Sequence, residues 1–160
     1  MPVELSSDQV WTALDKELFA VLGMVTAKGE ARTVGIVYTA RDRKIYIGTG
    51  KDTWKARHVA ANPKVSLTVT IPKRIPIMPW IKIPAATITC SGTARVIPGP
   101  EADPAVLRAI FRGLADDAKQ VAEMVVIEVV PQGEFLTYGV GIPLMQMRFP
   151  EKARGRAPVR

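Results

Sequence analysis

The chain has 160 residues, of which 48% are apolar and 23% are charged, and its formal net charge is +7; this length predicts one domain that buries about 68–70% of its unfolded surface. The single cysteine, Cys90, excludes an intramolecular disulfide, and with the single histidine, His58, it is too little for a structural zinc site. No apolar run is long enough to span a bilayer and the N-terminus lacks a signal-peptide layout, so we expect a cytoplasmic protein without a membrane partner.

The first quarter of the chain is predicted to form one helix and then strands joined by short turns. Residues 6–16 begin with Ser and Asp cap candidates and carry apolar residues on one helical face. Strands are expected over 18–27 and 31–39, with turns at 28–30 and 41–43. Consecutive strands that are joined by tight turns pair antiparallel, which favours an antiparallel barrel over a parallel sheet.

Residues 44–71, KIYIGTGKDTWKARHVAANPKVSLTVTI, are predicted to form a strand, a glycine-containing turn, a short helix and a second strand. The helix starts from a cap at Asp52 or Thr53, and an Asn-Pro pair at 62–63 ends it. Apolar and polar residues alternate over 65–71, which is the clearest strand pattern in the sequence.

Basic residues gather around the start of that helix, where Lys51 and Lys55 are followed by Arg57. A helix N-terminus carries partial positive charge and unpaired N–H groups, so cations there are mildly unfavourable unless an anion binds. Free amides, the Thr49 and Thr53 hydroxyls and the Lys55 ammonium would together form a phosphate site. The alternative is that these lysines are simply solvated surface residues.

The same residues resemble a known family. Thr49, Thr53 and Lys55, followed by Asn-Pro and a strand, are similar to the flavin-phosphate segment of the pyridoxamine 5'-phosphate oxidase-like family, although Trp54 stands where many members have Arg. The order of elements agrees with that family over roughly residues 7 to 140. The resemblance implies an α+β fold, namely an antiparallel split β-barrel of six to seven strands with two to three short helices.

The resemblance also implies where a flavin would bind. In the family the strand that contains Gly35 lies along the flavin ring, so its main chain would face the ring; a barrel-corner bend is the alternative explanation for this glycine. No catalytic residue and no metal ligand are predicted. The residues expected to bind the cofactor are Val34, Gly35, Ile36, Val37, Gly48, Thr49, Gly50, Thr53, Trp54 and Lys55.

The second half of the chain is predicted to contain further strands and a helix that pack on the core, and a proline-rich connection precedes them. The expected elements are a strand over 85–97, a helix from Asp103-Pro104 to Ala118, and strands over 123–130 and 135–140 joined around 131–133. The proline-rich connection 71–84 carries Trp80, which would pack on a partner subunit or form a lid over a ligand. Cys90 falls on an apolar strand face and is expected to be a buried residue, not a nucleophile.

The chain divides on this interpretation into a flavin-binding barrel domain, residues 1–142, and a C-terminal tail, residues 143–160. The tail holds several apolar residues and a basic end, and we expect it to pack on the barrel or on a partner. In the family the C-terminal segment often lies beside the partner's flavin site, which makes Arg148 a candidate contact. Exposed aromatic residues such as Trp80 and Phe149 favour a homodimer.

The expected function is an FMN-binding oxidoreductase that acts on a small molecule. The sequence offers no catalytic triad, carboxylate pair, metal cluster or P-loop, and a flavin supplies its own redox chemistry. Members of the family also bind the deazaflavin F420 or haem, and the extra cations Lys51, Arg57, Lys73 and Arg74 would suit the charged tail of F420. A basic barrel that binds nucleic acid is the third alternative, but no aromatic residues interleave with the basic ones on a predicted strand.

Overall fold

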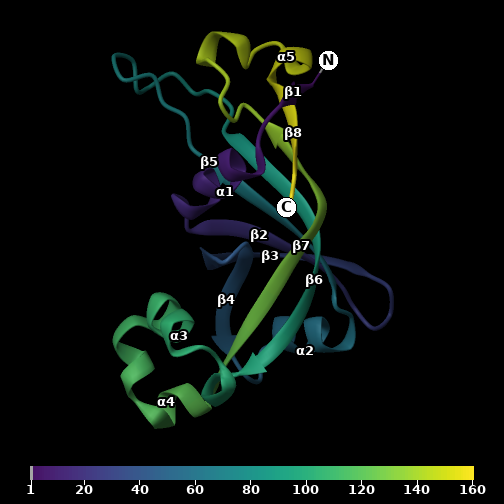
Figure 1. Cartoon of the computed structure of the whole chain (residues 1–160), viewed down its shortest axis with the longest axis vertical. Coiled ribbons are helices and arrows are strands. Elements are labelled where there is room, and N and C mark those ends of the chain that lie inside the picture. Colours follow the sequence, from purple (N-terminus) through teal and green to yellow (C-terminus); the bar gives the residue numbers. More distant parts are fainter. Residues whose placement is uncertain (1) are drawn as a thin grey trace.

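The computed structural model describes residues 2–160, which form one eight-stranded sheet with short helices at its ends (Figure 1). The strands are β1 (Val3–Glu4), β2 (Phe19–Val25), β3 (Ala31–Arg41), β4 (Lys44–Gly50), β5 (Lys64–Ile71), β6 (Ala86–Pro98), β7 (Met124–Tyr138) and β8 (Arg154–Pro158). The α-helices are α1 (Ser7–Asp15), α2 (Trp54–Ala61), α3 (Pro104–Phe111), α4 (Ala118–Ala122) and α5 (Pro150–Ala153). Short 3₁₀ helices cover Gly99–Glu101, Arg112–Asp116 and Leu144–Gln146.

Six of the strands close into a barrel. Their order is β7-β4-β3-β2-β5-β6, and β6 pairs with β7 to complete the ring. Every pairing in the ring is antiparallel. The α+β split β-barrel expected from the sequence is therefore confirmed. Within residues 2–160 the strands and helices outnumber the prediction, because β1 and β8 extend the sheet and the later helices are short pieces.

Local sequence signals set the first half of the fold. The Ser6 hydroxyl and the Gln9 side chain form a capping box at the start of α1. Gly29, with a φ of 80°, turns β2 back into β3. The two-residue turn between β3 and β4 consists of Asp42 and Arg43, whose φ values of 50° and 57° match the twist of a tight hairpin.

β7 was predicted as two strands with a turn around residues 131–133, and that prediction is wrong. The chain continues as one strand from Met124 to Tyr138, and both halves pair with β6 across a register shift between Thr89 and Ser91. On its other edge β7 pairs with β4 up to Val129 and with β8 only from Glu134. Pro131 lies between these two partners, where a missing N–H costs no ladder bond on that edge.

The helix predicted from Asp103-Pro104 to Ala118 is also shorter than expected. It begins as predicted, with the Asp103 carboxylate accepting a hydrogen bond from the Ala105 amide at 2.7 Å. It ends at Phe111, because Arg112 has a φ of 51° and cannot continue an α-helix. A 3₁₀ turn and α4 follow in place of the last turns.

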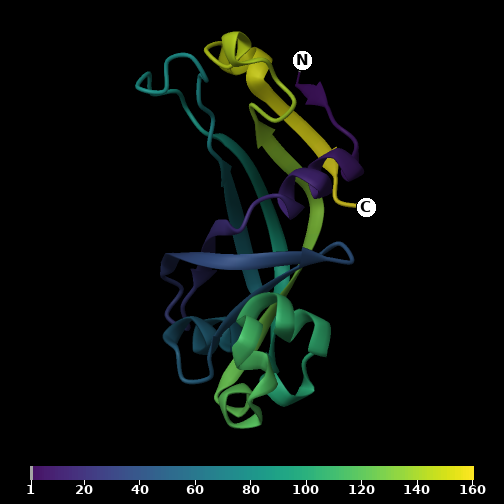
Figure 2. The same ribbon diagram turned by 90° about the vertical axis from the view of Figure 1, so that its left-hand side faces the viewer.

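The basic end of the tail is part of the sheet. Residues 154–158 form β8, which pairs antiparallel with β7, and β1 pairs parallel with β8. Strands β1 and β8 therefore lie side by side on the same sheet, in the half of the molecule away from α3 and α4 (Figures 1 and 2). The sequence reading predicted neither strand.

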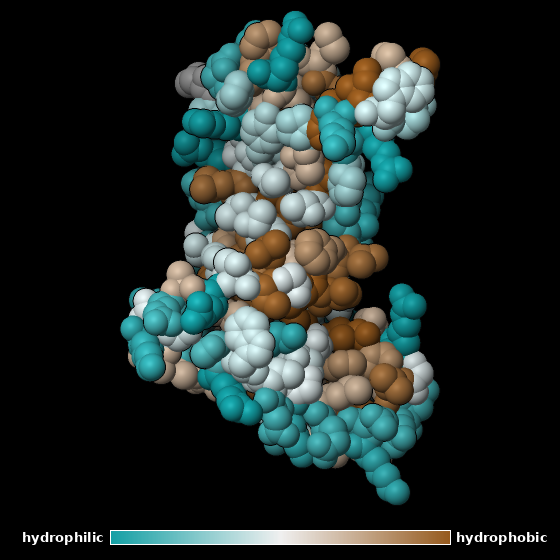
Figure 3. Space-filling model, turned by 180° about the vertical axis from the view of Figure 1, so that it is seen from behind, coloured by the Kyte–Doolittle hydropathy of each residue, from teal (hydrophilic) through white to brown (hydrophobic). Residues whose placement is uncertain are grey.

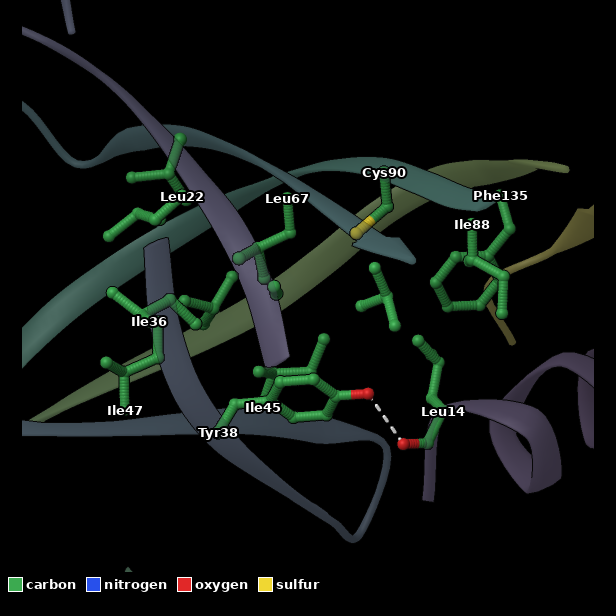
Figure 4. Close-up of a cluster of buried hydrophobic side chains, with 14 of the residues drawn as sticks. Leu14, Leu22, Ile36, Tyr38, Ile45, Ile47, Leu67, Ile88, Cys90 and Phe135 are labelled. Carbon is green, nitrogen blue, oxygen red and sulfur yellow. Dashed lines mark hydrogen bonds between the residues drawn. The ribbon is translucent and has the colours of Figure 1, made fainter. Parts of the chain in front are cut away.

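The main core fills the barrel and extends under α1. Figure 4 shows side chains of several strands pointing toward one another, with the Tyr38 hydroxyl donating to the Leu14 carbonyl at 2.7 Å. Burial is the main cause that raises the pKa of Tyr38 above its usual value. Cys90 is also buried, which raises the pKa of its thiol to about 12. A thiol of this kind is a packing residue, not a nucleophile.

One carboxylate is buried at the junction of three barrel strands. Glu128 on β7 lies opposite Tyr46 on β4 and Arg95 on β6, and it is 5% exposed. Its carboxylate accepts from Arg95 Nε at 2.8 Å and from Lys44 Nζ at 3.3 Å. The hydrogen bond from Arg95 is the largest cause that holds the pKa of Glu128 below its usual value, against the opposing effect of burial.

This arrangement predicts a pH-dependent loss of stability in Glu128→Gln. The amide keeps the shape but loses two charge-assisted bonds, so the free energy of unfolding at pH 7 should fall by about 1–3 kcal/mol. A depressed folded-state pKa stabilises the fold above the unfolded pKa, and that contribution disappears as the pH falls through the folded value. The free energies of unfolding of the wild type and Glu128→Gln, measured with urea, should therefore become equal at acid pH.

The control is Glu123→Gln, which removes an exposed partner of Lys51 and should shift the unfolding midpoint little. A gap between wild type and Glu128→Gln that stays constant down to the acid transition would contradict this account of Glu128.

Candidate functional site

The strand–turn–helix segment from β4 to α2 folds as its sequence predicts. β4 ends at Gly50, Thr53 occupies the N-cap position of α2, and Asn62 ends the helix in an extended conformation before Pro63. The turn is held against the start of β7, because the Lys51 amide donates to the Glu123 carbonyl at 3.0 Å and Lys51 Nζ lies 2.9 Å from Glu123 Oε1. The start of α2 is therefore fixed by the barrel itself.

Two threonine hydroxyls meet at this turn. Thr53 Oγ1 donates to the Gly50 carbonyl at 3.0 Å, and the Thr49 and Thr53 hydroxyl oxygens are 3.1 Å apart. A hydroxyl has one proton, so Thr49 is the donor in the pair. Because Thr53 is engaged in this way, its side chain does not cap α2. The first amides of the helix, from Trp54 onward, are left for water or an anion.

Lys55 is the basic residue that this turn leaves uncommitted. It is half-buried in the first turn of α2, and within residues 2–160 it forms no ion pair. Of the neighbouring cations, Lys51 pairs with Glu123, while Arg57 Nη2 donates to the Asp52 carbonyl at 2.9 Å and the guanidinium keeps its charge. No acidic residue lies in the first turn of α2. The helix start and Lys55 together form a positive cradle, defined here as Thr49, Thr53, Lys55 and the first amides of α2.

β3 separates from β4 beside this cradle. The β3–β4 register ends at Tyr38 opposite Ile47, while β3 stays paired with β2 down to Ala31. The Tyr38 amide donates to Leu18 on the β2 side at 2.9 Å. Hydrogen-bonding direction alternates along a strand, so the amide and carbonyl of Gly35 face the β4 side, where the ladder has ended. These are unpaired backbone groups beside the opening between β3 and β4.

The predicted ring-contacting residues have unequal exposure. Val34 is half-buried, Ile36 is buried and Val37 is 61% exposed. Gly35 is exposed, and a Cβ placed on it would lie 3.0 Å from the ring of Phe19 on β2. The missing side chain therefore leaves room for Phe19, which lies diagonally across the β2–β3 ladder from Gly35; the sequence analysis did not predict this contact.

The glycines of the turn serve different purposes. A Cβ on Gly48 would lie 2.3 Å from Ile110 and 2.6 Å from Phe111, so Gly48 lets α3 pack closely against β4. Gly50 is exposed beside Thr53. Trp54 is 46% exposed, and its ring meets His58 edge-on with centroids 5.6 Å apart. Of these residues, Gly50 and Trp54 flank the cradle and Gly48 belongs to the packing beneath α3.

Exposed apolar side chains lie near Gly35, on β2 and β3 and at the residue before β2. Leu18, Phe19 and Val37 are each exposed by 46% or more, and Phe19 pairs with Val37 across β2 and β3. Hydrophobic residues also gather over the middle of the face shown in Figure 3. We call Leu18, Phe19 and Val37 the β2–β3 patch.

The structure does not bring Trp80 or Arg148 to the cradle. The 71–85 connection and the segment before α5 lie at one end of the molecule, and α2 lies toward the other in both views (Figures 1 and 2). Trp80 therefore cannot be a lid over the cradle of its own chain.

Two large surface pockets are also separate from the cradle. One of about 470 Å³ lies beside α1, and one of about 500 Å³ lies between the β2–β3 turn and strands β5 and β6. Neither is lined by Thr49, Thr53 or Lys55. Within residues 2–160 no three His, Cys, Asp or Glu side chains are grouped to hold a metal ion. No helix in that range is long and apolar enough to cross a membrane.

A family model described as pyridoxamine 5'-phosphate oxidase matches residues 6–138. The chain belongs to this family. The match includes the cradle, the opening between β3 and β4, and the β2–β3 patch. Among curated protein sequences, none matches this chain.

Solved structures with the same fold carry several different names. A protein from Listeria innocua provisionally named pyridoxamine 5'-phosphate oxidase superposes with a TM-score of 0.58 at 20% identity, covering 78% of this chain and 92% of the other. An F420 reductase gives 0.53 at 19% identity, covering 78% and 93%. A heme binding protein from Mycobacterium smegmatis gives 0.63 at 17% identity, covering 83% of this chain and 53% of the other. At these identities the likeness shows the fold alone.

Proposed function

We propose that this member of the pyridoxamine 5'-phosphate oxidase family binds FMN and acts as an oxidoreductase on a small molecule. The observation that carries the proposal is the cradle: an uncapped helix start, two coupled hydroxyls and one unpaired lysine on a single rigid turn. Each of these features favours a terminal phosphate, and together they leave positive charge uncompensated without one.

The chain's residues would hold FMN at two places. Lys55, the Thr49 and Thr53 hydroxyls and the α2 amides would bind the phosphate, and the backbone of Val34–Val37 would bind the polar edge of the ring. The β2–β3 patch would exclude water from the ring. FMN itself supplies the redox chemistry when bound. The protein is then required to bind, orient and shield, which agrees with a site that holds no acid–base pair.

F420 is the second candidate cofactor, because one structural neighbour is named an F420 reductase. The structure offers its charged tail fewer cations than the sequence suggested. Lys51 is already paired with Glu123, which leaves Arg57 as the added cation near the turn, and the connection that carries Lys73 and Arg74 lies toward the other end of the molecule. A compact phosphate ligand therefore fits the cradle better.

Haem is favoured less than either flavin. The chain has one histidine, His58, and its ring is half-buried against Trp54, so a haem would have to displace that contact to gain an imidazole ligand. A cytoplasmic location is part of the same proposal, because the single cysteine is a buried thiol and needs no oxidising compartment.

We further propose that two chains form a homodimer through the β2–β3 patch. Leu18 and Val37 are each 61% exposed, and Val37 belongs to the strand segment that would contact the ring. Burial of the patch by a second copy would complete both sites at once, as twofold symmetry requires.

The phosphate assignment predicts different losses for FMN and riboflavin in Lys55→Met. Only FMN carries the phosphate, and a charge-assisted hydrogen bond of about 1.5–3 kcal/mol corresponds to about a 10- to 150-fold loss in affinity. Riboflavin affinity should change little. Lys51→Met is the matched control, since its ammonium pairs with Glu123. Equal losses for both ligands in a fluorescence titration would refute the assignment.

The assignment of FMN as the cofactor predicts that FMN binds more tightly than F420 and that its affinity depends only weakly on salt. The apo-protein should bind FMN more tightly than F420 in competition titrations, and raising the salt to 1 M should weaken FMN only modestly, because the cradle contacts are short. A clear preference for F420 that collapses in salt would mean that distant cations carry the binding. The absorption spectrum of the purified protein provides an independent check, because FMN, F420 and haem absorb differently.

The dimer proposal predicts a twofold mass in light scattering at micromolar concentration with flavin bound. Phe19→Ser should shift the mass toward the monomer, because it removes an aromatic side chain from the centre of the patch. Leu136→Ser changes a comparably exposed residue on β7, outside the patch, and should leave the mass unchanged. A monomer mass for the flavin-loaded wild type would overturn the proposal.

A further inference from the structure

The connection between β5 and β6 presents an apolar tip. Two consecutive turns shape it, with the Met78 amide donating to the Ile75 carbonyl and the Ile81 amide donating to the Met78 carbonyl, each at 3.1 Å. Ile77 is 85% exposed and Trp80 is 74% exposed. Four prolines between residues 71 and 84 restrict the backbone, so the tip is formed before it meets any partner.

A second apolar segment lies at the same end of the molecule. The 3₁₀ turn and α5, residues 144–153, are found beside this connection at one end in both ribbon views (Figures 1 and 2). Met145 is 70% exposed and Phe149 is 39% exposed. The side chains of Arg148 and Lys152 lie over the Phe149 ring, 4.8 and 5.1 Å from its centroid.

Most of the net charge of the chain is concentrated around these apolar side chains. The segments 71–85 and 143–154 hold six basic residues, Lys73, Arg74, Lys82, Arg148, Lys152 and Arg154, and one acidic residue, Glu151. They therefore contribute +5 of the total +7. Within residues 2–160 none of the six cations forms an ion pair.

We propose that this end of the protein, residues 71–85 and 143–154, binds the surface of an anionic phospholipid bilayer. A protruding tip of Trp, Ile and Met would enter the interfacial region, where an indole ring is favoured. The surrounding Lys and Arg side chains would reach the lipid phosphates. A protein groove that accepted the apolar tip would also have to neutralise six cations, whereas an anionic bilayer meets both requirements with one surface.

This contact is peripheral and needs no bilayer-spanning segment, but it departs from the expectation that the protein has no membrane partner. It does not depend on the proposed cofactor, because the cradle lies toward the other end of the chain. Lys55→Met, which is expected to weaken FMN binding, should therefore bind vesicles as the wild type does. Failure of one proposal thus leaves the other testable.

Co-sedimentation with vesicles tests the proposal. The full-length protein should sediment with mixed phosphatidylglycerol–phosphatidylcholine vesicles at 0.1 M salt, and it should stay in the supernatant with phosphatidylcholine alone. Raising the salt to 1 M should release it, because screening then acts within about 3 Å. Reversing two charges, in Lys73→Glu with Arg74→Glu, should weaken binding by at least about tenfold. Arg108→Glu with Lys119→Glu, on α3 and α4, reverses the same number of charges and should weaken binding less.

The apolar tip has its own controls. Ile77→Ser with Trp80→Ala should reduce sedimentation, while Leu114→Ser, an exposed apolar position beside α3, should not. Brominated lipids should quench the tryptophan fluorescence of the wild type. Trp80→Phe should keep most of the binding but lose most of the quenching, since Trp11 and Trp54 lie outside the tip.

Three results would overturn the proposal. These are equal sedimentation with neutral and anionic vesicles, undiminished sedimentation of the tip variant, or quenching that persists in Trp80→Phe. A tip variant that loses its dimer mass without lipid and still sediments normally would show instead that the surface meets a second copy of the chain.

Discussion

Closure of the barrel depends on one strand, β7, which pairs along one edge with β6 and along the other first with β4 and then with β8. β4 joins the ring through β3 and β7, and β6 joins it through β5 and β7. The buried Glu128 carboxylate marks the point where β4, β7 and β6 are held together by charge as well as by backbone bonds. The other strands of the ring, β3, β2 and β5, connect β4 to β6 through their own ladders.

The candidate site follows from what β4 does after it has paired with β7. β4 remains bound to β7 as far as Gly50, whereas its pairing with β3 stops at Tyr38 and Ile47. The turn into α2 is thus fixed on one side, and the edge of β3 is open on the other. A charged turn on a rigid strand beside an unpaired strand edge gives polar recognition at two places with little conformational cost. Rigid placement of this kind is what cofactor binding needs.

The sequence was sufficient where the signals are local. Caps, turns and alternating strands predicted α1, the β2–β4 meander and the β4–α2–β5 segment. The sequence did not predict pairings between residues that are far apart along the chain. Nothing near Pro131 indicates that β7 changes partner there, and β8 has no strand pattern until β7 offers it an edge. The ion pair between Lys51 and Glu123, which is 72 residues away, was likewise not predicted, so Lys51 was wrongly counted among the cations free to bind a ligand.

The pairing of β1 with β8 has a consequence for how the molecule assembles and opens. Val3 lies opposite Gly155, so this short ladder encloses almost the whole chain, whereas the β3–β4 hairpin closes over two residues. Contacts of such separation in sequence form after the local ones, so the strands at the two ends should join last. They should also separate first in local opening, since within residues 2–160 the outer edge of β8 is held by a two-residue ladder with β1 and by the Leu5 amide, which donates to the Arg156 carbonyl at 2.9 Å. The β1–β8 ladder can therefore open while the six-stranded barrel stays closed.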